Sequence, residues 1–330
     1  MNNPQDIRKV IRTDFQRFEE AFALCLQSED RLLSQVCDYV HSKRGKQLRP
    51  ILVLLSAALC RGITDKTIQT AVALELMHTA SLIHDDVVDD SPMRRGSEAV
   101  HTVWTNKIAI LVGDYLLTRV MHILAELRNV TILHIVSDMG AALTAGELLQ
   151  LHSGESMWIS EEQYNKVIEQ KTACLFAACS EAGAASTGAT PRQMAAIKQF
   201  GLHLGMCFQL KDDVLDFSDT EDIGKPTMND IRDGKATLPL LISLKRAQAE
   251  EAEHIREIAE ALANKSAHID PFEAEQEIKS FILRYDGIRY AHQEMEKHRK
   301  KAIAALSIFA DNKYKESLIT LLNYAINRIK

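Results

Sequence analysis

The residue types with the clearest chemistry are four aspartates that fall within one stretch of six residues: Asp85, Asp86, Asp89 and Asp90. An apolar stretch with helical periodicity precedes them. On a helix, Asp85 and Asp89 share one face, and Asp86 and Asp90 form a second pair of this kind. Like charges at that spacing repel and destabilise a bare helix by a few tenths of a kcal/mol. Clustered carboxylate oxygens suit Mg²⁺, which would offset the repulsion. The alternative is a solvated acidic helix end.

A second cluster of the same spacing decides between these interpretations. Asp212, Asp213 and Asp216 again follow an apolar helical stretch. Two clusters of this kind are improbable by chance. We therefore expect two carboxylate clusters, at the ends of two helices, to face each other across a cavity and to bind Mg²⁺ there.

Basic residues near both clusters are suited to a ligand that carries two or more phosphates. The segment 42–50 is a basic loop with a glycine, for which a solubilising turn is the alternative. The segment 218–236 is a long polar loop that we interpret as a lid, since long loops in compact domains are usually functional or disordered. The cations expected to complete the phosphate clamp are Lys46, Arg49, Arg94, Arg95, Lys225 and Lys235.

The sequence contains no convincing nucleophile, because neither a G-x-S-x-G turn nor a Cys–His motif occurs. A site of this kind is built to neutralise the charge of a phosphorylated leaving group. We therefore expect an ionisation, in which a metal-held diphosphate departs and leaves a carbocation.

The composition favours an all-helical protein that could position these clusters. Of the 330 residues 46% are apolar, whereas proline (7) and glycine (14) are scarce. Helical periodicity extends over most of the chain, with Asp65 as the expected N-cap of the helix that reaches the first cluster. Capping boxes start further helices at Ser160, Thr190 and Asp270. Because no low-complexity linker is present, we expect residues 1–330 to form a single all-α domain.

Charge and hydropathy exclude several classes of protein. The net charge is −6, and no basic stripe for nucleic acid is present. The six cysteines show no C-x-x-C spacing, as expected for reduced thiols in the cytosol. Residues 1–20 are charged throughout, and the longest apolar runs, 51–60 and 108–117, do not suffice to span a bilayer. We expect a cytoplasmic protein whose only membrane contact is peripheral.

Taken together, these motifs resemble those of the trans-prenyltransferases, the all-trans isoprenyl (polyprenyl) diphosphate synthases. The resemblance extends from about residue 40 to residue 320. It includes Gly45–Pro50, which is similar to the GKxxRP element, and the first DDxxD motif with its pair of arginines. It also includes the second DDxxD motif, which is followed by Gly224-Lys225-Pro226.

The resemblance implies an all-α homodimer with an isoprenoid-synthase-type helical bundle around a central cavity. It also implies an Mg²⁺-dependent condensation of isopentenyl diphosphate onto an allylic diphosphate of the farnesyl or geranylgeranyl type. The steps would be ionisation, condensation and elimination, and the released pyrophosphate would take the final proton.

The family's roles carry over to matching positions of this chain. Asp85, Asp86, Asp89, Asp212, Asp213 and Asp216 would bind about three Mg²⁺ ions, for which Mn²⁺ is a substitute. Arg94, Lys171, Lys225 and Lys235 would contact the allylic diphosphate, and Lys46, Arg49, His78 and Arg95 would bind isopentenyl diphosphate. Lys171, Thr172 and Gln209 would place dipoles near the allylic cation, and Phe208 would lie near the homoallylic substrate. Without the resemblance, His78 would be interpreted as a packed core histidine.

The product length depends on the residues one helical turn before the first cluster, Ala80 and Ser81. In the family, a bulky aromatic here stops growth at short products, so two small residues imply an open tunnel. A helix of some 25 residues is about 37 Å long and could flank about seven isoprene units, which favours a product of about C30 to C50. Such a product suits a quinone side chain. Alternatively, Met77 or Leu116 closes the tunnel sooner.

Three rival functions remain open at this point. A class I terpene cyclase would ionise a similar substrate, although its second metal motif is normally of a mixed Asn/Ser/Glu type. A non-catalytic partner subunit of a heteromeric synthase is the second rival, and intact carboxylates disfavour it. A metal phosphohydrolase built on His84-Asp85 is the third, but His78 and His101 are a poor basis for its further ligands.

Overall fold

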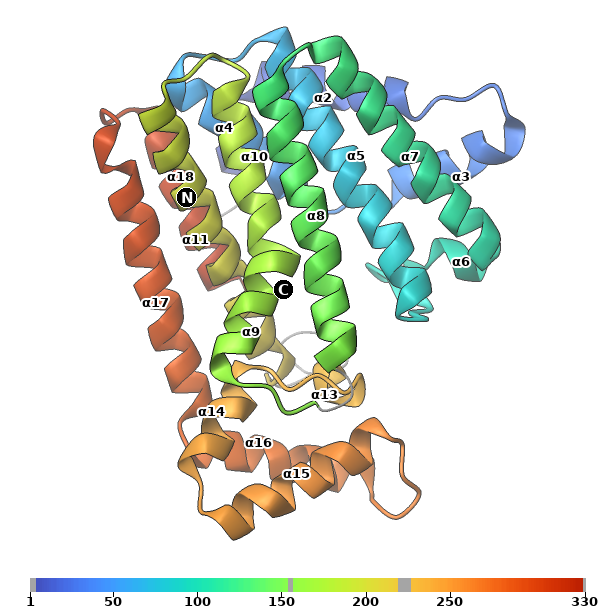
Figure 1. Cartoon of the computed structure of the whole chain (residues 1–330), viewed down its shortest axis with the longest axis vertical. Helices are drawn as coiled ribbons and strands as arrows, with labels where there is room; N and C mark the ends of the chain where they lie inside the picture. Colours follow the sequence, from blue (N-terminus) through green and yellow to red (C-terminus); the bar gives the residue numbers. More distant parts are fainter. Residues whose placement is uncertain (1–3, 154–156, 219–226, 329–330) are drawn as a thin grey trace. The chain divides into compact units, whose positions relative to one another are not determined.

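The computed structural model describes residues 4–153, 157–218 and 227–328. Nearly all regular structure in these ranges is helical, as Figure 1 shows. The strands found there are the two-residue strands β1 (Met93–Arg94) and β2 (Ser97–Glu98), which pair as an antiparallel hairpin. The prediction of an all-α protein is therefore confirmed.

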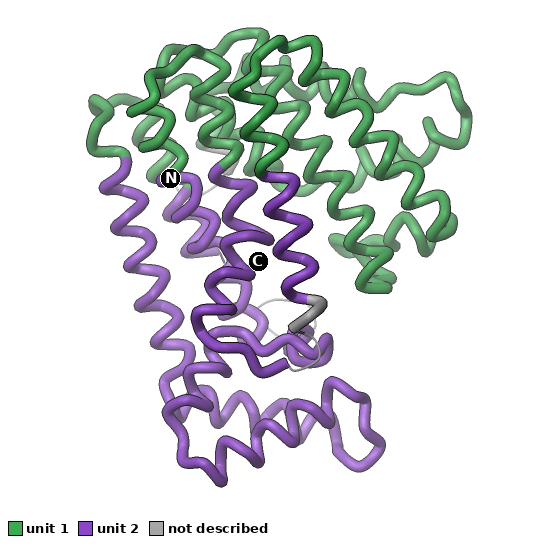
Figure 2. The backbone as a smooth tube through the Cα atoms, in the orientation of Figure 1, with its two compact units in different colours: residues 1–138, 178–198, 306–321 green, residues 139–177, 199–305, 322–330 purple. Residues whose placement is uncertain are grey.

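The chain divides into two compact units, which Figure 2 shows in different colours. Unit 1 consists of residues 1–138, 178–198 and 306–321, and unit 2 of residues 139–177, 199–305 and 322–330. Four of the five boundaries fall within helices α8 (Val130–Ser153), α10 (Cys174–Ala185), α11 (Pro191–Asp216) and α18 (Lys313–Asn327), and the fifth lies between residues 305 and 306. That the chain acts as one domain stays a prediction.

Unit 1 contains the N-terminal helices and the first aspartate cluster. Its other elements are α1 (Pro4–Lys9), α2 (Arg12–Cys25), α3 (Arg31–Ser42), α4 (Leu48–Cys60), α5 (Asp65–Val88), α6 (Val100–Val103), α7 (Asn106–Leu127) and the 3₁₀ helix η2 (Leu306–Ile308). Unit 2 contains α9 (Glu161–Ile168), the π-helix η1 (Glu169–Ala173), α13 (Asn229–Arg232), α14 (Leu238–Arg246), α15 (Ala249–Ala263), α16 (Pro271–Arg284) and α17 (Gly287–Ala305).

Helix α5 is the centre of unit 1 and carries the first aspartate cluster at its C-terminal end. It packs along α7, which lies beside it in Figure 1, and against α4 and α2. The close approach to α7 requires Gly113, because a methyl group there would overlap the imidazole of His84. Because α5 contacts helices on several sides, most of its residues are buried. The first cluster therefore stands on a rigid element.

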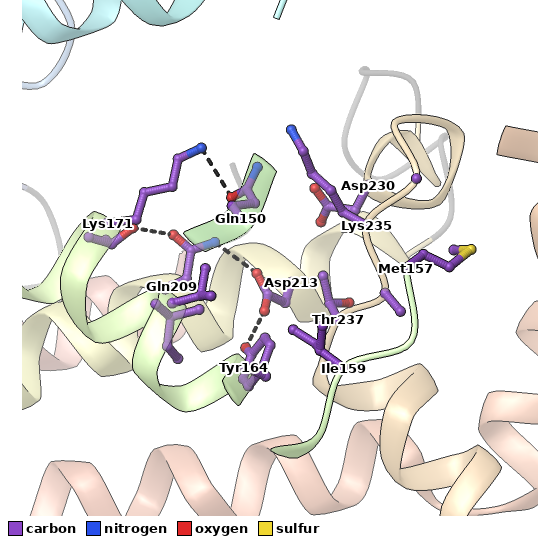
Figure 3. Close-up of a pocket in the computed structure, with 15 residues that line it drawn as sticks. Gln150, Met157, Ile159, Tyr164, Lys171, Gln209, Asp213, Asp230, Lys235 and Thr237 are labelled. Carbon is purple, nitrogen blue, oxygen red and sulfur yellow. Dashed lines mark hydrogen bonds between the residues drawn. The ribbon is translucent and has the colours of Figure 1, made fainter. Parts of the chain in front are cut away.

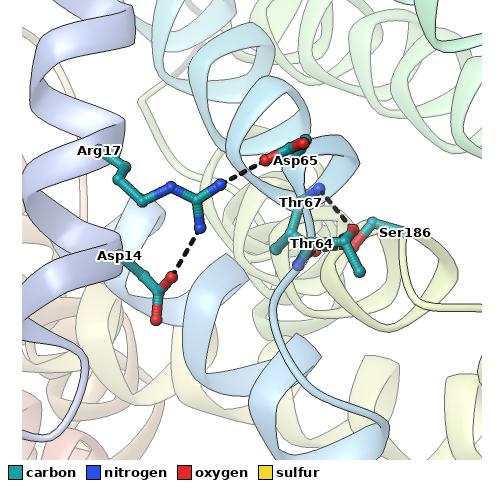
Figure 4. A network of polar contacts seen from close by, with 6 residues as sticks. All are labelled: Asp14, Arg17, Thr64, Asp65, Thr67 and Ser186. Carbon is teal, nitrogen blue, oxygen red and sulfur yellow. Dashed lines mark hydrogen bonds and ion pairs between the residues drawn. The ribbon is translucent and has the colours of Figure 1, made fainter.

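The start of α5 differs from the sequence prediction. Thr64, and not Asp65, is the N-cap: its hydroxyl accepts a hydrogen bond from the backbone amide of Thr67, and Thr67 caps back. Thr67 also contacts Ser186 at 2.7 Å, whereas Asp65 pairs with Arg17 (Figure 4). A threonine that precedes the expected cap can use the same orphan amide groups, which is why sequence alone misplaced the cap by one residue.

Unit 2 is assembled from short helices around α14. Helix α14 packs against α16 and α17, and α15 packs against α16. A methyl group at Gly287 would overlap the carbonyl oxygen of Pro239, so α17 approaches α14 very closely. The predicted capping boxes at Ser160 and Thr190 are both formed, and Asp270 caps α16 as expected.

In the part of the chain that the structure describes, two helices pass a test of length and apolar composition for crossing a membrane. They are α7, over Asn106–Leu127, and α8, over Val130–Gln150. Within the apolar stretches of α7 and α8, only 39% and 28% of the residues, respectively, are buried. Both helices therefore carry exposed apolar side chains. Core helices of soluble proteins pass the same test, and the prediction that no segment crosses a membrane stays a prediction.

Candidate active site

The second aspartate cluster ends helix α11, and its middle residue is buried. The Asp213 carboxylate accepts hydrogen bonds from Gln209 Nε2 (2.8 Å) and from the Tyr164 hydroxyl, as Figure 3 shows. Burial raises the pKa of Asp213 to about 7, and the negative charges of Asp212 and Asp216 add to the rise. Asp213 is thus a buried carboxylate that is held by a hydroxyl group and an amide group.

Asp216 contacts a helix that the sequence did not predict. Its carboxylate accepts hydrogen bonds from the backbone amides of Asn229 and Asp230, each at 3.1 Å, at the start of α13. The expected polar lid over 218–236 is therefore partly helical, and Met228 and Ile231 are fully buried. Residues 219–226 lie outside the described ranges, so the lid itself stays a prediction. The helix was missed because its four residues are too few to show a periodicity.

Asp230 is a functional candidate that sequence reasoning missed. It lines the same cavity as Asp213 and Lys171, a space of about 190 Å³. Burial raises the pKa of Asp230 well above its usual range, and repulsion from Asp213 and Asp216 adds to this. Its position in a polar loop, with no spacing that relates it to the DDxxD motif, offered no signal in the sequence.

These carboxylates have the chemistry of an Mg²⁺ site. Three of them lie together on or beside one helix end, and burial raises the pKa of each, with repulsion from neighbouring aspartates adding to the rise. Oxygen ligands in this arrangement are those that Mg²⁺ prefers, and a bound cation would remove the repulsion. Within the described part of the chain, however, no three His, Cys, Asp or Glu side chains are close enough to form a metal site on their own.

Lys171 and Thr172 lie in the π-helix η1, a widened turn in a helix that was predicted to be continuous. Lys171 Nζ is 2.6 Å from Glu147 Oε2 and 3.1 Å from Gln150 Oε1. The Thr172 hydroxyl donates to Gln209 Oε1 at 2.7 Å. Glu147 and Gln150 therefore hold Lys171 in place, and π-helical turns of this type are frequent at functional sites.

A continuous line of hydrogen bonds joins three of the residues of unit 2 that the sequence predicted for the site. It runs from Thr172 through Gln209 to Asp213, and Tyr164 donates to Asp213 from the other side (Figure 3). Lys235 lines the same cavity, with its Nζ 4.0 Å from Asp233. Lys225 lies outside the described residues. The structure thus brings Lys171, Thr172, Gln209, Asp213 and Lys235 into the lining of one cavity.

Phe208 is covered by a side chain that the sequence did not single out. The Arg328 guanidinium lies 3.9 Å from the centre of the Phe208 ring and donates to the Phe208 carbonyl oxygen at 2.9 Å. The same guanidinium is 2.7 Å from Asp212 Oδ1. Arg328 therefore ties the C-terminal end of α18 to the second cluster. No motif marks it in the sequence, because the contact joins positions that are far apart along the chain.

The first aspartate cluster lies in unit 1, where α5 ends. Asp86 is buried and accepts hydrogen bonds from Arg94 through Nε (2.7 Å) and Nη2. Asp89 follows the last turn as the C-cap, and Asp90 adopts a left-handed backbone with a φ of 48°. The second i,i+4 pair is thereby broken, since Asp90 has left the helix. Arg94, expected to bind diphosphate, is engaged by Asp86 in this structure.

A pocket of about 70 Å³ lies beside this cluster, and we call it the basic pocket. Its polar lining residues are Tyr39, Lys43, Arg44, Glu75, His78, Thr79, Asp86, Arg94, Arg95 and Glu98. The pocket brings together the predicted His78, Arg94 and Arg95, whereas Lys46 is exposed and its carbonyl accepts a hydrogen bond from Arg8. Lys43, Arg44 and Glu75 were not assigned roles from the sequence.

The electrostatics of this pocket are dominated by arginine. Burial lowers the pKa of His78 well below its usual value, and the charges of Arg49, Arg95 and Arg94 lower it further. His78 is therefore a neutral imidazole near neutral pH. Arg95 lies against the backbone of Gly45, because a methyl group there would come within 2.8 Å of its Cζ atom. An anionic ligand suits such a pocket.

The two residues expected to set the product length differ in exposure. Ala80 is fully buried within unit 1, and Ser81 is half-buried. The Ser81 hydroxyl donates to the His78 carbonyl oxygen at 2.9 Å. Both side chains are small, and the role of the two residues in a tunnel stays a prediction.

Comparison with known proteins gives consistent matches. The family model described as Polyprenyl synthetase matches residues 30–275. The octaprenyl diphosphate synthase of Haemophilus influenzae is 35% identical, over 98% of this chain and 96% of that protein.

Solved structures match over the whole chain as well. A polyprenyl synthase from Caulobacter crescentus, crystallised with calcium and isoprenyl diphosphate, has a TM-score of 0.91 and 32% identity, over 100% of this chain and 99% of that one. A geranylgeranyl pyrophosphate synthase from Bacteroides thetaiotaomicron has a TM-score of 0.83 and 38% identity, over 98% of each chain.

Replacement of Arg328 by alanine should lower the free energy of unfolding by about 1–3 kcal/mol, because a largely buried guanidinium loses three contacts at once. Chemical denaturation followed by circular dichroism measures the effect. The matched control is Arg284→Ala, which removes an exposed ion pair with Glu251 and should change stability by only about 0–1 kcal/mol. Equal effects of the two substitutions would show that Arg328 does not anchor α18.

Proposed function

The chain belongs to the polyprenyl synthetase family, and from this premise we propose that the carboxylates of both aspartate clusters hold the Mg²⁺ used in chain elongation. Two DDxxD motifs, in a chain that the family matches over residues 30–275, are the observation that carries the proposal. The individual residue roles below are part of the same proposal.

The activity of the chain follows from the family. The chain is a trans-prenyltransferase that makes a medium- or long-chain polyprenyl diphosphate, as the sequence predicted. The substrates of this family are isopentenyl diphosphate and an allylic diphosphate, and the family depends on Mg²⁺. A terpene cyclase and a phosphohydrolase are thereby set aside.

The metal ligands we propose are Asp85, Asp86, Asp89, Asp212, Asp213 and Asp216, with Asp230 beside them. Their number suits about three Mg²⁺ ions, and Mn²⁺ is a chemically similar substitute. The relative from Caulobacter crescentus was crystallised with calcium, which also takes oxygen ligands. Bound metal would neutralise the charge of the departing diphosphate. The burial of these carboxylates and the repulsion from neighbouring aspartates, which raise their pKa values, support the assignment, because a bound cation would offset both effects.

The side chains of unit 2 would act on the allylic substrate. Lys171, steadied by Glu147 and Gln150, would hold its diphosphate together with Arg94, Lys225 and Lys235. As the allylic C–O bond breaks, the Thr172 hydroxyl and the Gln209 amide would place their negative ends near the developing carbocation. The fixed hydrogen bond between them means that little reorganisation is needed.

The basic pocket of unit 1 would bind isopentenyl diphosphate. Arg49, His78 and Arg95, with Lys46 from the adjoining loop, would contact its phosphates. Phe208 would lie near the homoallylic carbons. The new carbon–carbon bond would form from the isopentenyl double bond, and the proton then lost would pass to the released pyrophosphate. This route explains why the sequence shows no dedicated side-chain base.

We propose that Ala80 and Ser81 leave room for a product near the eight-isoprene length made by the octaprenyl relative. A product of this size suits a quinone side chain. The geranylgeranyl relative shows that closely similar chains also stop at shorter products. The length is therefore a matter for direct measurement.

We further propose that the chain is a homodimer in the cytoplasm. Helix α7 exposes Ile110, Leu111 and Met121, and α8 continues this with Val130 and Leu133 in the part that belongs to unit 1. Exposed apolar faces of this extent mark interaction sites, and a second copy of the chain is the partner that the family implies. Charged Asp114 and Arg119 on α7 disfavour insertion of this helix into a bilayer. Peripheral membrane contact would serve release of the apolar product.

Asp85→Ala and Asp212→Ala should each reduce the rate of condensation by orders of magnitude, because each removes a metal ligand. Incorporation of labelled isopentenyl diphosphate onto farnesyl diphosphate measures the rate, and circular dichroism confirms folding. The control is Asp90→Asn, which alters the aspartate of the first cluster that has a left-handed backbone and should retain near-normal turnover. Near-normal turnover in either alanine variant would refute the metal role, and no condensation by the wild-type chain alone would support the partner-subunit alternative.

Ala80→Phe should shorten the product, because an aromatic ring would block the tunnel one turn below Asp85. Chromatographic sizing of the dephosphorylated product against polyprenol standards measures its length. Since Ala80 is fully buried, the unfolding midpoint is measured in parallel, and Ser81→Phe offers a half-buried second position. An unchanged product length in folded enzyme would contradict the tunnel.

The double variant Ile110→Glu/Met121→Glu should convert the dimer to monomer, because it places charge on two exposed positions about three turns apart on one face of α7. Sedimentation velocity measures the mass in solution. The matched control is Phe272→Glu, an exposed apolar residue on α16 that should leave the mass unchanged. A wild-type chain that sediments as a monomer would reject the proposed homodimer.

A further inference from the structure

The basic pocket of unit 1 contains a buried carboxylate to which the proposed reaction assigns no role. Glu75 lies on α5, one turn before His78, and is only 6% exposed. It lines the pocket together with His78, Arg94 and Arg95. Buried carboxylates normally have hydrogen-bond partners for both oxygens. Among the residues described, however, Glu75 Oε2 has none.

Three arginines present positive charge to this carboxylate, whereas Asp86 and Glu98 are the other acidic residues that line the pocket. Arg49 on α4, Arg95 in the β1–β2 turn and Arg44 in the loop before α4 act on Glu75, in that order of strength. Lys43, Arg94 and His78 also line the pocket, and the nearest negative lining group on α5 is Asp86, which Arg94 binds. Burial raises the pKa of Glu75, whereas the three arginines lower it. The ionised form of Glu75 thus depends on the positive charges of these three arginines.

A diphosphate in this pocket would change that balance. Its negative charges would neutralise the same arginines, and they would also repel the Glu75 carboxylate directly. Both effects act in a desolvated place, where screening by water is weak. A protonated Glu75 removes the repulsion, and its Oε2–H becomes a donor where the carboxylate oxygen had no partner.

We propose that Glu75 takes up one proton from solvent when isopentenyl diphosphate fills the basic pocket, so that Glu75 sets the charge of the occupied site. The free site with ionised Glu75, one proton and the diphosphate give an occupied site in which Glu75 is a neutral acid. The inference rests on the proposed function, because it takes isopentenyl diphosphate as the ligand. Glu75 is a positioning residue in this scheme. Its protonation adjusts the net charge of the pocket to that of the bound ligand, and it transfers no proton to the reacting carbons.

One consequence concerns affinity and pH. Because the occupied site holds more protons than the free site, the affinity for isopentenyl diphosphate falls as the pH rises through the range in which Glu75 takes up its proton. Without Glu75 as a titrating group, this part of the pH dependence disappears.

Isothermal titration calorimetry with isopentenyl diphosphate alone tests the proposal, since no turnover occurs without the allylic substrate. The full chain is titrated at one pH in buffers of different ionisation enthalpy, and the slope of the observed enthalpy counts the protons taken up. The wild-type chain should show a larger uptake than Glu75→Gln, which keeps the size of the side chain but binds no proton. Protons lost by the ligand itself contribute equally to both and cancel in the difference. The matched control is Glu98→Gln, an exposed glutamate that lines the same pocket and should keep the wild-type slope.

Each outcome decides the matter. Equal slopes for wild type and Glu75→Gln would overturn the proposal, and so would a loss of uptake confined to His78→Gln, because the proton would then be on the imidazole. If Glu75→Gln does not fold, the infrared difference spectrum of wild type with and without isopentenyl diphosphate decides: a new carbonyl band of a protonated carboxylic acid supports the proposal, and its absence overturns it. No heat of binding for the wild type in any buffer is a different result, which rejects the isopentenyl diphosphate site itself.

Discussion

Carboxylates that are crowded together without enough positive charge are the constraint on which the rest of this structure depends. Asp213 is buried, Asp216 and Asp230 lie beside it, and the pKa of all three is raised by burial and mutual repulsion. Such a group is stable only if hydrogen bonds and cations hold it. The fold supplies them from several elements: Tyr164 and Gln209 for Asp213, and the amides at the start of α13 for Asp216.

Arginine plays the same part at two further aspartates, one in each cluster. Arg94 binds Asp86 in unit 1, and Arg328 binds Asp212 in unit 2. In both cases a guanidinium binds a carboxylate that we propose as a metal ligand. The arginine thereby compensates negative charge that a bound metal would otherwise compensate. These arginines would have to share or release the carboxylates when metal and diphosphate bind. The order in which the ligands enter is thus linked to two specific ion pairs.

Charge balance also links the two halves of the proposed chemistry. The second cluster has an excess of negative charge, whereas the basic pocket of unit 1 has an excess of positive charge, although the buried acidic residues Glu75 and Asp86 also line it. Bound metal would neutralise the negative excess of the cluster, and a diphosphate would neutralise the positive excess of the pocket. In the proposed reaction the released pyrophosphate takes the proton, so electrostatics carries most of the work.

The sequence by itself determined the all-α class, most helix starts, both DDxxD motifs and the family, because these depend on local spacing, capping chemistry and composition. Its errors were local as well: Thr64 replaced Asp65 as the N-cap, and α13 was too short to show a period. Only the tertiary structure decided which side chains meet. The contacts of Tyr164 and Arg328 with the second cluster, and the burial of Glu75 among arginines, join residues that are distant in the chain. No spacing rule encodes such contacts, since they arise from the packing of whole helices.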